Sequence, residues 1–519
     1  MSKNYHYLVN NLKHKISDNP DIQRLLSKHF PFIYNSLKSG EVSYSVTRRS
    51  IDARHKDNLN FNFTIILHSD KVIDKLEKFR YSYPTPEGLP VTHLSDKHPF
   101  IIGMGPAGLF CALELVDRGF QPYLFDRGKA IDERDTDVSD FWQNAILNPE
   151  SNVQFGEGGA GTFSDGKLTA RNRTVYSQKV FDYLIKFGAD PDIRINALPH
   201  LGTDGLKSIL KNIRNYLISK GAQFFFSHKL TDISIKNNKI DSVTINDIIY
   251  NPEILILALG NSARDTFRLL NDRKIKLESK PFAVGFRIEH TQEYINSAFY
   301  GNNTDFGITG PAVYNLTAQC PPYGVYSFCM CPGGFVIPAS SSEGFQVVNG
   351  MSNLKRDNLF ANSAIVATVN QKDFGNAPLD GIIFQEKIES KAFDNYQAPI
   401  QSAKDYLSNR SGNKIPRHSY SLGQSSIKIS SLFPENLDKA LKSALISFNK
   451  SIPHFADEGI LIAPETRTSC PIRICRDDYH RFSLSAKNLF PIGEGSGYAG
   501  GIISSASDGI KTALLFSLK

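Results

Sequence analysis

A glycine-rich turn after a short apolar run constrains the fold of this chain more than any other stretch. Residues 98–102 read HPFII, residues 103–108 read GMGPAG, and residues 109–116 continue as LFCALELV. The first segment is typical of a short buried strand, and the third has helix-forming residues with apolar positions at helical spacing. A strand, a glycine turn and a helix in this order are the context that a dinucleotide-binding fingerprint requires.

The glycines of this turn have separate physical roles in such a fingerprint. Gly103 allows the tight turn, Gly105 lets the backbone approach a pyrophosphate, and Gly108 lets the helix pack close to the strand. The free backbone amides at the start of the helix then face the phosphates. The motif by itself leaves one alternative open, a glycine turn in an ordinary strand–helix–strand unit.

The residue that ends the next predicted strand supports nucleotide binding. Residues 121–125 (QPYLF) have the pattern of a strand, and Asp126 follows it, 23 positions after Gly103. A carboxylate at about this place in a dinucleotide-binding fold accepts hydrogen bonds from the ribose hydroxyls. Two such bonds, at roughly 1.5–3 kcal/mol each, would anchor the adenosine end of a cofactor.

The composition is that of a soluble globular protein with several domains. The 519 residues correspond to roughly three domains of ordinary size, and 41% of the residues are hydrophobic and 21% charged. No apolar run approaches the roughly 18 residues that a membrane span needs. Residues 1–6 lead into no apolar signal region, so we expect a cytoplasmic location.

The cysteines are too few and too scattered for a secreted disulfide framework. The six are Cys111, Cys320, Cys329, Cys331, Cys470 and Cys475. Neither the pair at 329 and 331 nor the pair at 470 and 475 has CxxC spacing, and we predict no metal site. We expect each to be a reduced thiol that packs as a small apolar residue.

Residues 1–98 form a predicted small α+β module with a basic surface, ending in a proline-rich linker. The segment holds 15 Lys and Arg against 10 Asp and Glu. A helix is predicted to start at Pro20 and Asp21, and residues 60–67 alternate like a half-buried strand. Arg48, Arg49 and Arg54 form either a surface ion cluster or a docking surface for an anion. Nucleic acid is a possible but not an expected partner, because a solvated basic face is commoner.

The most glycine-dense stretch, residues 154–167, reads QFGEGGAGTFSDGK and has five glycines between positions 156 and 166. Backbone of this kind can approach a flat ligand closely, at a cost of roughly 0.5–1 kcal/mol for each glycine that is fixed. A flexible surface loop is the alternative. Glu157, Asp165 and Lys167 lie among the glycines and favour a site.

The middle of the chain divides into two predicted parts, the end of the nucleotide-binding half and a separate domain. Residues 223–226 and 242–245 are predicted strands around a turn at 236–239, and residues 254–259 form an apolar run that ends at Gly260. The nucleotide-binding half would therefore carry an inserted β-meander. Residues 281–459 show no second fingerprint and are predicted to form a substrate domain with a mixed or antiparallel sheet. Its histidines (His290, His418 and His454) are expected to be structural.

The C-terminal part has a second strand–turn–helix sequence. Residues 488–502 read NLFPIGEGSGYAGGI, in which one carboxylate, Glu494, lies in the glycine turn. The amides at the start of the following helix would stabilise a negative charge by roughly 0.3–1 kcal/mol, and by up to about 2 kcal/mol when partly buried. A reduced flavin carries such a charge at one edge of its ring.

Taken together, these pieces resemble FAD-binding flavoproteins of the glutathione-reductase-like fold. The fingerprint with Asp126, the strand end at residues 258–260 and the Gly493–Glu494 turn match the three dispersed cofactor motifs of that group. More narrowly, the chain resembles the bacterial family of uncharacterised FAD-dependent dehydrogenases. The matching stretches are residues 50–54, 148–168, 260–266, 280–285, 326–334, 465–469 and 493–501.

The resemblance implies a non-covalent FAD and the residues that would hold it. The pyrophosphate would lie on the fingerprint, the adenosine ribose on Asp126, the ribityl chain at Glu494, and the isoalloxazine between residues 156–167 and residues 497–502. The implied cofactor-binding residues are Gly103, Gly105, Pro106, Ala107, Gly108, Asp126, Arg127, Gly158, Gly159, Gly161, Thr162, Ser164, Gly260, Gly493, Glu494, Gly500, Gly501 and Ile502.

Three departures from related flavoproteins bear on the chemistry. Many relatives have Asp where this chain has Glu494, so the ribityl contact would be direct or shifted. Residues 156–167 lack the CxxxxC pair of disulfide reductases, which argues against thiol–disulfide chemistry. A second nucleotide fingerprint is also missing, which leaves direct binding of NAD(P)H as electron donor open.

The sequence therefore predicts an FAD-dependent oxidoreductase that passes hydride or electron pairs between a small organic substrate and FAD. The expected domains are residues 1–98, a discontinuous FAD-binding domain of residues 99–280 and 460–519, and a substrate domain of residues 281–459. Arg467, Arg473 and Lys167 are the candidate catalytic residues. The alternatives are a flavoprotein whose N-terminal module docks on RNA or a protein partner, and a flavin-free NAD dehydrogenase. The substrate and the oligomeric state stay open.

Overall fold

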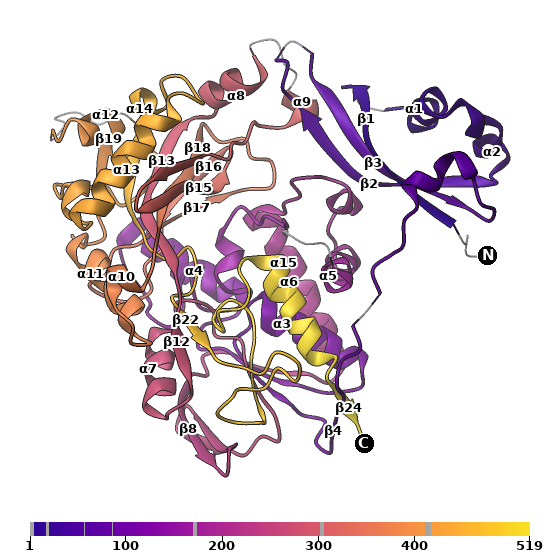
Figure 1. The fold of residues 1–519 in the computed structure, drawn as a ribbon. Helices are drawn as coiled ribbons and strands as arrows, with labels where there is room; N and C mark the ends of the chain where they lie inside the picture. The colour runs from indigo at the N-terminus through magenta and orange to yellow at the C-terminus, as the bar shows by residue number, and fades with distance from the viewer. Residues whose placement is uncertain are drawn as a thin grey trace.

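The structure is a computed structural model that describes residues 5–16, 20–56, 58–85, 87–169, 174–301, 306–410 and 417–519. Figure 1 shows a small N-terminal module, a parallel sheet with helices, and a larger second sheet with its own helices. The predicted fold class is confirmed: a Rossmann-like domain with an inserted β-meander, a largely antiparallel second domain and a small α+β module.

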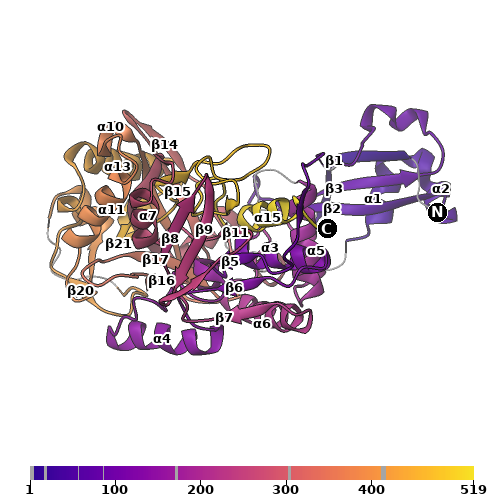
Figure 2. The same cartoon turned by 90° about the horizontal axis from the view of Figure 1, so that it is seen from below.

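The N-terminal module is a three-stranded antiparallel sheet in the order β1-β3-β2. Its elements are β1 (Tyr5–Lys15), α1 (Ile22–His29), α2 (Tyr34–Ser39), β2 (Val42–Asp52) and β3 (Asn60–Ser69). The helix predicted near Pro20 begins after Asp21, whose side chain accepts a hydrogen bond from the Arg24 amide at 2.8 Å. Figure 2 shows the module at one end of the molecule.

The predicted arginine cluster of the module lies partly in contacts within the chain. Arg49 donates to Asp192 at 2.9 Å and to Asn196 at 2.8 Å, and so ties the module to the main body. Arg54 is paired with Asp52 at 2.6 Å, whereas Arg48 is exposed. Two of the three guanidinium groups are therefore already engaged by carboxylates.

The central parallel sheet explains the position of the glycine turns. Its five strands have the order β23-β11-β5-β6-β7 and are all parallel. They are β5 (Phe100–Ile102), β6 (Tyr123–Phe125), β7 (Gln223–Phe225), β11 (Leu255–Leu257) and β23 (Leu489–Pro491). The carboxyl ends of parallel strands share one edge of a sheet, so the turns after β5, β6, β11 and β23 meet there although they are far apart in sequence.

Helices cover this sheet, and the predicted meander is inserted before β11. The helices that pack around the sheet are α3 (Pro106–Asp117), α5 (Val175–Lys186), α6 (Gly202–Ser219), α7 (Arg264–Asp272) and α15 (Ile502–Ala513), whereas α4 (Ile131–Asn144) packs on α6 and on the strand β16 (Gly334–Pro338) of the second domain. Figure 1 shows the C-terminal α15 beside α3, with which it packs closely. The meander is a three-stranded antiparallel sheet of β8 (Leu230–Lys236), β9 (Lys239–Ile245) and β10 (Ile248–Tyr250).

The second sheet has seven strands in the order β14-β15-β18-β13-β21-β19-β20 and is antiparallel except for the last pair. They are β13 (Phe282–Thr291), β14 (Thr317–Cys320), β15 (Tyr323–Cys331), β18 (Phe360–Val369), β19 (Ala398–Ser402), β20 (Gln424–Ser425) and β21 (Ile460–Glu465). The hairpin of β16 (Gly334–Pro338) and β17 (Val348–Ser352) packs beside it. Because β21 pairs with β13, the sheet extends beyond residue 459, where we expected the substrate domain to end.

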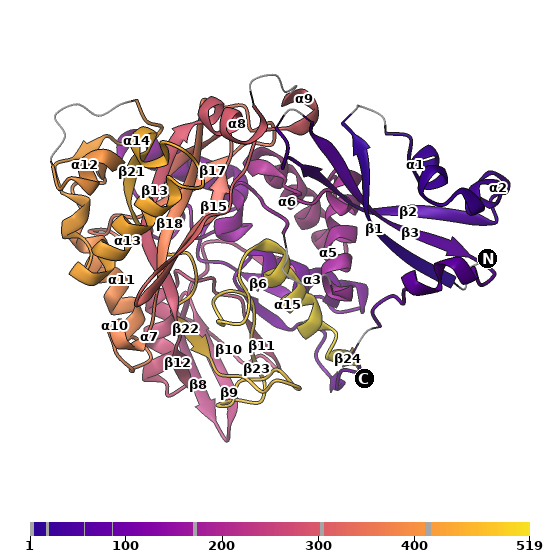
Figure 3. The same cartoon turned by 45° about the horizontal axis from the view of Figure 1, so that its top comes forward.

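Helices cover the side of the second sheet that faces away from the parallel sheet (Figure 3). They are α8 (Gln292–Tyr300), α10 (Gln371–Phe374), α11 (Asp380–Lys391), α12 (Ala403–Leu407), α13 (Glu435–Phe448) and α14 (Phe455–Glu458). The short α9 (Phe306–Thr309) lies instead beside the N-terminal module, where Ile308 packs against the core of that module (Figure 3). The 3-10 helices are η1 (Pro31–Ile33), η2 (Asp74–Phe79), η3 (Gly159–Phe163), η4 (Pro191–Arg194) and η5 (Ile429–Ser431). Buried His290 donates a hydrogen bond from Nε2 to the Phe455 carbonyl at 2.8 Å within this layer.

Two small sheets join distant parts of the chain. The strand β12 (Leu277–Ser279) pairs with β22 (Ile472–Ile474), and β4 (Thr92–Leu94) pairs with β24 (Phe516–Leu518). The linker from the N-terminal module therefore ends beside the C-terminus. Among the described residues, none of the helices combines the length and apolar character that crossing a bilayer demands.

Candidate functional site

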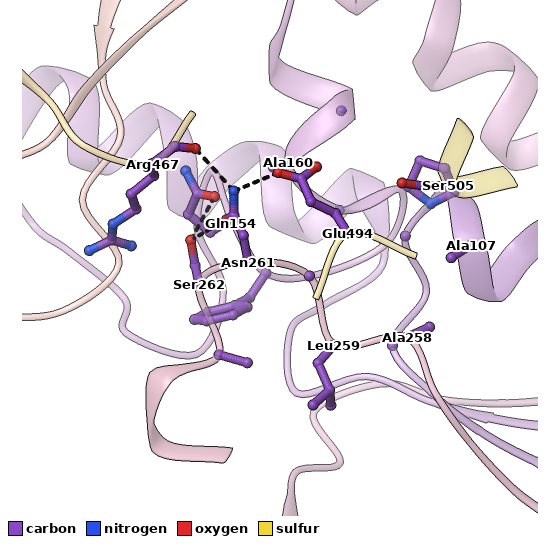
Figure 4. Close-up of a pocket in the computed structure, with 18 of the residues that line it drawn as sticks. Ala107, Gln154, Ala160, Ala258, Leu259, Asn261, Ser262, Arg467, Glu494 and Ser505 are labelled. Atoms are coloured by element: carbon purple, nitrogen blue, oxygen red, sulfur yellow. Dashed lines mark hydrogen bonds between the residues drawn. The ribbon is translucent and has the colours of Figure 1, made fainter. Parts of the chain in front are cut away.

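A cavity of about 270 Å³ lies at the carboxyl ends of the parallel strands and is closed on its other side by the second sheet. One wall comes from the turns after β5, β6, β11 and β23 and from residues 154–167. The facing wall comes from β15, β17 and the end of β21. Figure 4 shows the side chains where the two walls meet.

The fingerprint glycines occupy three different steric environments. A Cβ at Gly103, whose φ is +105°, would lie 2.3 Å from the Ala258 carbonyl oxygen, and a Cβ at Gly108 would lie 2.0 Å from the Gly103 oxygen. Both positions therefore require glycine for the packing of the protein itself. A Cβ at Gly105 would instead meet only the Gly159 Cα, at 3.8 Å, among the described residues. The space beside Gly105 is open and belongs to the cavity.

Two helix N-termini converge on this cavity. The N-cap of α3 is Gly105 and that of α15 is Gly501, and in the described part of the chain no side chain caps either helix. Both N-caps and the first residue of each helix line the cavity. The close approach of the helices depends on Gly509, where a Cβ would lie 2.2 Å from the Ala107 oxygen. The cavity therefore receives two sets of helix-start amides, each of which favours a negative charge.

Asp126 connects the fingerprint to the next strand. Its carboxylate accepts hydrogen bonds from the Met104 amide at 2.8 Å and from the Gly128 amide at 2.9 Å. The residue is 7% exposed and lines the cavity. A carboxylate has about four acceptor sites, so two stay available to hydroxyl groups of a ligand.

An ion cluster flanks this end of the cavity. Arg127 donates to Asp265 at 2.6 Å, and Lys229 contacts the same carboxylate at 2.9 Å. Burial would raise the pKa of Asp265, but the two cations outweigh it and lower the pKa to about 2. Arg127 also lies over the Phe155 ring, 4.5 Å from its centroid. The guanidinium of Arg127 is therefore held in place beside Asp126.

The glycine-rich segment packs directly on the fingerprint, with the Gly158 amide donating to the Met104 carbonyl at 2.8 Å. Glu157 is fully buried and accepts from the Ile131 amide at 2.9 Å and from Arg214 at 2.6 Å. Its role is to join α4 and α6, and it does not line the cavity. Asp165 does line the cavity and is held by Arg356, whose Nε donates at 2.9 Å.

Glu494 lies where the two walls of the cavity meet (Figure 4). It accepts from Asn261 Nδ2 at 2.9 Å and from the Gly501 amide at 3.4 Å, and burial raises the pKa of its carboxyl. The same Asn261 amide group donates to the Arg467 carbonyl at 3.0 Å. Asn261 therefore fixes the turn after β11 to Glu494 on one side and to the end of β21 on the other.

The two predicted catalytic arginines have different positions. The Arg467 backbone lines the cavity, but its guanidinium points away from Glu494 and is paired with buried Glu389 at 3.0 Å and with Ser341 at 2.5 Å. Arg473 does not belong to the cavity wall. It lies on β22, with its guanidinium 5.1 Å from the centroid of the Tyr498 ring, so the structure does not bring Arg473 together with the other predicted site residues.

Lys167 and Cys329 line the cavity from opposite sides of the domain boundary. Lys167 donates to the Met330 carbonyl and lies 3.2 Å from Asp165. Burial would lower its pKa, but Cys331, Cys329 and Asp165 raise it above the ordinary value. No local pattern could place a cysteine here, because Cys329 is more than 160 positions from Lys167 in the chain.

The structure brings most, but not all, of the predicted site residues into the cavity wall. Those that line it are Gly103, Gly105, Pro106, Ala107, Asp126, Arg127, Gly159, Gly161, Ser164, Lys167, Gly260, Arg467, Glu494, Gly501 and Ile502. Those outside the wall are Gly108, Gly158, Thr162, Arg473, Gly493 and Gly500. Sequence reasoning missed His228, Leu230, Phe328, Cys329, Asn349, Glu465 and Thr468. No group of metal-ligating side chains is found within the described ranges.

Comparison with known proteins identifies the family. Residues 281–468 match the sequence model of the FAD-dependent protein, C-terminal domain-like family. An uncharacterized protein of Clostridium beijerinckii is 40% identical over 525 residues, covering 97% of each chain. The chain belongs to a bacterial family of FAD-dependent proteins.

Solved structures also show similarity to this FAD-dependent protein. CtdE in complex with FAD and substrate 4 is 9% identical, with a TM-score of 0.32 over 80% of this chain and 78% of that chain. Halogenase PltM in complex with phloroglucinol and FAD is 11% identical, with a TM-score of 0.36 over 80% and 68%. The L-amino acid deaminase from Proteus vulgaris is 11% identical, with a TM-score of 0.34 over 84% and 96%.

FAD is the cofactor of this family, and the cavity carries groups that suit it. A dinucleotide needs a glycine that leaves room for a pyrophosphate beside helix-start amides, and Gly105 at the start of α3 provides it. It needs an acceptor for ribose hydroxyls, and Asp126 keeps acceptor sites free. The residues present therefore fit the cofactor.

Proposed function

We propose that this FAD-dependent protein is an oxidoreductase that transfers a hydride or an electron pair between a small organic substrate and a non-covalently bound FAD. The supporting observation is that one cavity combines the uncapped starts of α3 and α15 with the carboxylate of Asp126. This combination suits a ligand with a diphosphate, a ribose and a second group that becomes negatively charged.

The proposed binding mode follows from the chemistry of the cavity wall. The pyrophosphate would lie against Gly105 and the first amides of α3, and the adenosine ribose would meet Asp126. The ribityl chain would pass Glu494, which Asn261 already orients. The isoalloxazine would occupy the space between residues 156–167 and the start of α15.

When bound, FAD supplies the two-electron chemistry, and the chain supplies binding, orientation and charge. The amides at the start of α15 would stabilise a negative charge over Gly501 and Ile502 by about 0.3–1 kcal/mol, or up to about 2 kcal/mol when partly buried. Wall residues from both domains limit the access of water to this end of the cavity. A water-poor site strengthens each of these electrostatic interactions.

The substrate would enter from the side of the second sheet. Phe328 and Asn349 line the cavity there, and Lys167 contributes a cation to the same region. Arg467 is committed to Glu389 and Ser341, so we propose that it holds the wall in place and that Lys167 positions an anionic or polar group of the substrate. This assignment favours substrates with a carboxylate or another hydrogen-bond acceptor.

The direct experiment is to purify the full chain, release the bound flavin by denaturation and identify it. FAD at about one per chain is expected. The holoprotein is then mixed anaerobically with NADH, NADPH and a panel of small carboxylate-bearing metabolites, and two-electron bleaching of the flavin is followed by absorption. Failure to bind FAD after reconstitution would refute the cofactor assignment. Bound FAD that no organic hydride donor bleaches, and whose reduced form no organic acceptor reoxidises, would refute the oxidoreductase.

A further inference from the structure

Cys329 and Cys331 form a pair of thiols at the substrate side of the cavity. They lie at the end of β15, where the pairing with β18 shifts register between Phe328 and Cys331. Cys329 has φ +47°, in the left-handed region that favours glycine, and it lines the cavity. Cys331 is fully buried and does not line the cavity. The bulge therefore leaves Cys329 at the cavity wall and Cys331 in the protein interior.

The two cysteines contact each other. The Cys331 thiol donates a hydrogen bond to the Cys329 carbonyl oxygen, with the sulfur 3.3 Å from the oxygen. The neighbouring Cys331 thiol, together with Lys167 and Arg287, holds the pKa of Cys329 well below the ordinary value of a thiol, although burial acts against it. The same contact raises the pKa of Cys331. Cys329 is thus the thiol of the pair that loses its proton more readily.

Cations and carboxylates surround the pair. Arg287 Nη1 lies 3.1 Å from the Cys329 carbonyl oxygen and 3.9 Å from the Cys331 sulfur, and Lys167 binds the Met330 carbonyl between them. Asp165 and Glu465 face the pair through these cations, at Lys167 and Arg287 respectively. Arg287 and Lys167 each bind a backbone carbonyl of the Cys329–Met330 segment, and a cation beside a thiol is typical of reactive cysteines.

Three of the other thiols differ sharply from this pair. Burial raises the pKa of Cys111, raises that of Cys470 to about 12 and raises that of Cys475 to about 11. Cys320 is buried on β14, and none of these four residues lines the cavity among the described residues. Our expectation of a small apolar residue fits Cys111, which packs in the core around α3. It does not describe Cys329.

We propose that Cys329 and Cys331 are a redox-active dithiol–disulfide couple that exchanges an electron pair with the FAD in this cavity. The inference rests on the proposed function, because the flavin is the oxidant. The Cys329 thiolate and the Cys331 thiol form one S–S bond as the S–H bond of Cys331 breaks. The electron pair and that proton pass together to the oxidised flavin, so electrons, protons and charge balance.

The spacing permits this bond. A β-strand rises about 3.2–3.4 Å per residue, so two residues of strand separate the Cα atoms of Cys329 and Cys331 by about 6.4–6.8 Å. A disulfide needs Cα atoms about 4.4–6.8 Å apart. Residues 156–167 contain no cysteine, whereas this pair lies on the opposite wall, on β15, where Cys329 lines the cavity.

The test is an anaerobic reductive titration of the air-oxidised holoprotein with dithionite. A flavin alone takes up two electrons and a disulfide takes up two more, so the wild type should consume about four electrons per flavin. Cys331→Ser and Cys329→Ser should each consume about two. Cys320→Ser, which removes a buried thiol that does not line the cavity, should still consume about four.

A second measurement does not depend on the flavin. The protein is denatured under an alkylating agent before and after treatment with a disulfide-forming oxidant, and the peptide that carries both cysteines is weighed. The oxidised peptide should escape alkylation, and its mass should be two hydrogens below that of the same peptide with two unmodified thiols. Flavin-loaded wild type that takes up only two electrons, with both thiols alkylated after oxidation, would overturn the couple. A chain that binds no FAD refutes the proposed function, while the peptide mass still reports on the thiols.

Discussion

Replacing Gly105 by Ala should weaken FAD binding while leaving the stability of the apoprotein unchanged. Gly105 has φ −75° and ψ −174°, which is ordinary extended backbone, so alanine adopts it without strain. The added Cβ would have one protein neighbour within 4 Å among the described residues, the Gly159 Cα at 3.8 Å. The apoprotein therefore accommodates the methyl group, whereas a pyrophosphate bound against Gly105 would collide with it.

The magnitudes follow from these contacts. In the apoprotein, the smaller freedom of the unfolded chain stabilises the variant by about 0.4–1 kcal/mol. Loss of glycine at the N-cap of α3 costs about 0.5–1 kcal/mol, so the two effects nearly cancel. In the holoprotein, an extra methyl group in a filled site costs about 1–3 kcal/mol. The dissociation constant of FAD should therefore rise by about 5- to 150-fold.

The assay measures FAD binding and apoprotein stability on the same preparations. The matched control is Gly324→Ala on β15, where a Cβ would meet no described atom within 4 Å and the cavity is not involved. We expect the unfolding midpoints of both apoproteins to stay near that of the wild type, and only Gly105→Ala to lose FAD affinity. An unchanged FAD dissociation constant for Gly105→Ala would refute the position of the pyrophosphate.

Two further predictions use other positions. Gly260→Ala and Gly40→Ala introduce the same left-handed strain, at φ +71° and +79°, each with no described atom within 4 Å of the new Cβ. Both variants should lose about 1–2 kcal/mol of folding stability. Only Gly260 lines the cavity, so only Gly260→Ala should bind FAD more weakly than the wild type. Equal FAD affinities of the two variants in calorimetric titrations would contradict the position of FAD beside Gly260. Burial raises the pKa of Glu289 from 4.5 to about 7, although Ser419 opposes this. The folded state thus keeps a proton that the unfolded state has lost, and stability falls by up to about 3 kcal/mol as pH rises through this window. Glu289→Gln should gain thermal stability relative to wild type between pH 5 and 7.5; parallel profiles would contradict this. Burial lowers the pKa of His290 to about 4, an effect that is present in both proteins and cancels.

Local patterns predicted the elements around the cofactor site well. The turn between β5 and α3 needs glycine at two positions. A Cβ at Gly108 would collide with the Gly103 oxygen a few residues away, and a Cβ at Gly103 would collide with the Ala258 oxygen at the end of β11, the neighbouring strand of the sheet. The meander and the Asp126 position follow from strand and turn patterns of similarly short range. Such features are set by backbone sterics and hydrophobic periodicity, which are written in the sequence.

The contacts across the domain boundary were not predictable in this way. Arg467 is next to a cavity-lining turn, yet its guanidinium is directed to Glu389, which lies on α11 some 78 positions away. Arg473 alternates with buried neighbours on β22 and faces Tyr498. A charged side chain in a sequence motif can serve either a ligand or a buried partner, and only the position of the partner decides which.

By itself, the sequence determined that the chain has a dinucleotide-binding half with two glycine turns, because those turns depend on short-range sterics. The tertiary structure decided that the starts of α3 and α15 open into one cavity and that β15 brings Cys329 beside Lys167. The β-bulge and the surrounding charges then give that thiol an environment unlike that of a core cysteine. The physical reason is that a side chain's charge state depends on neighbours supplied by distant strands, which no local pattern encodes.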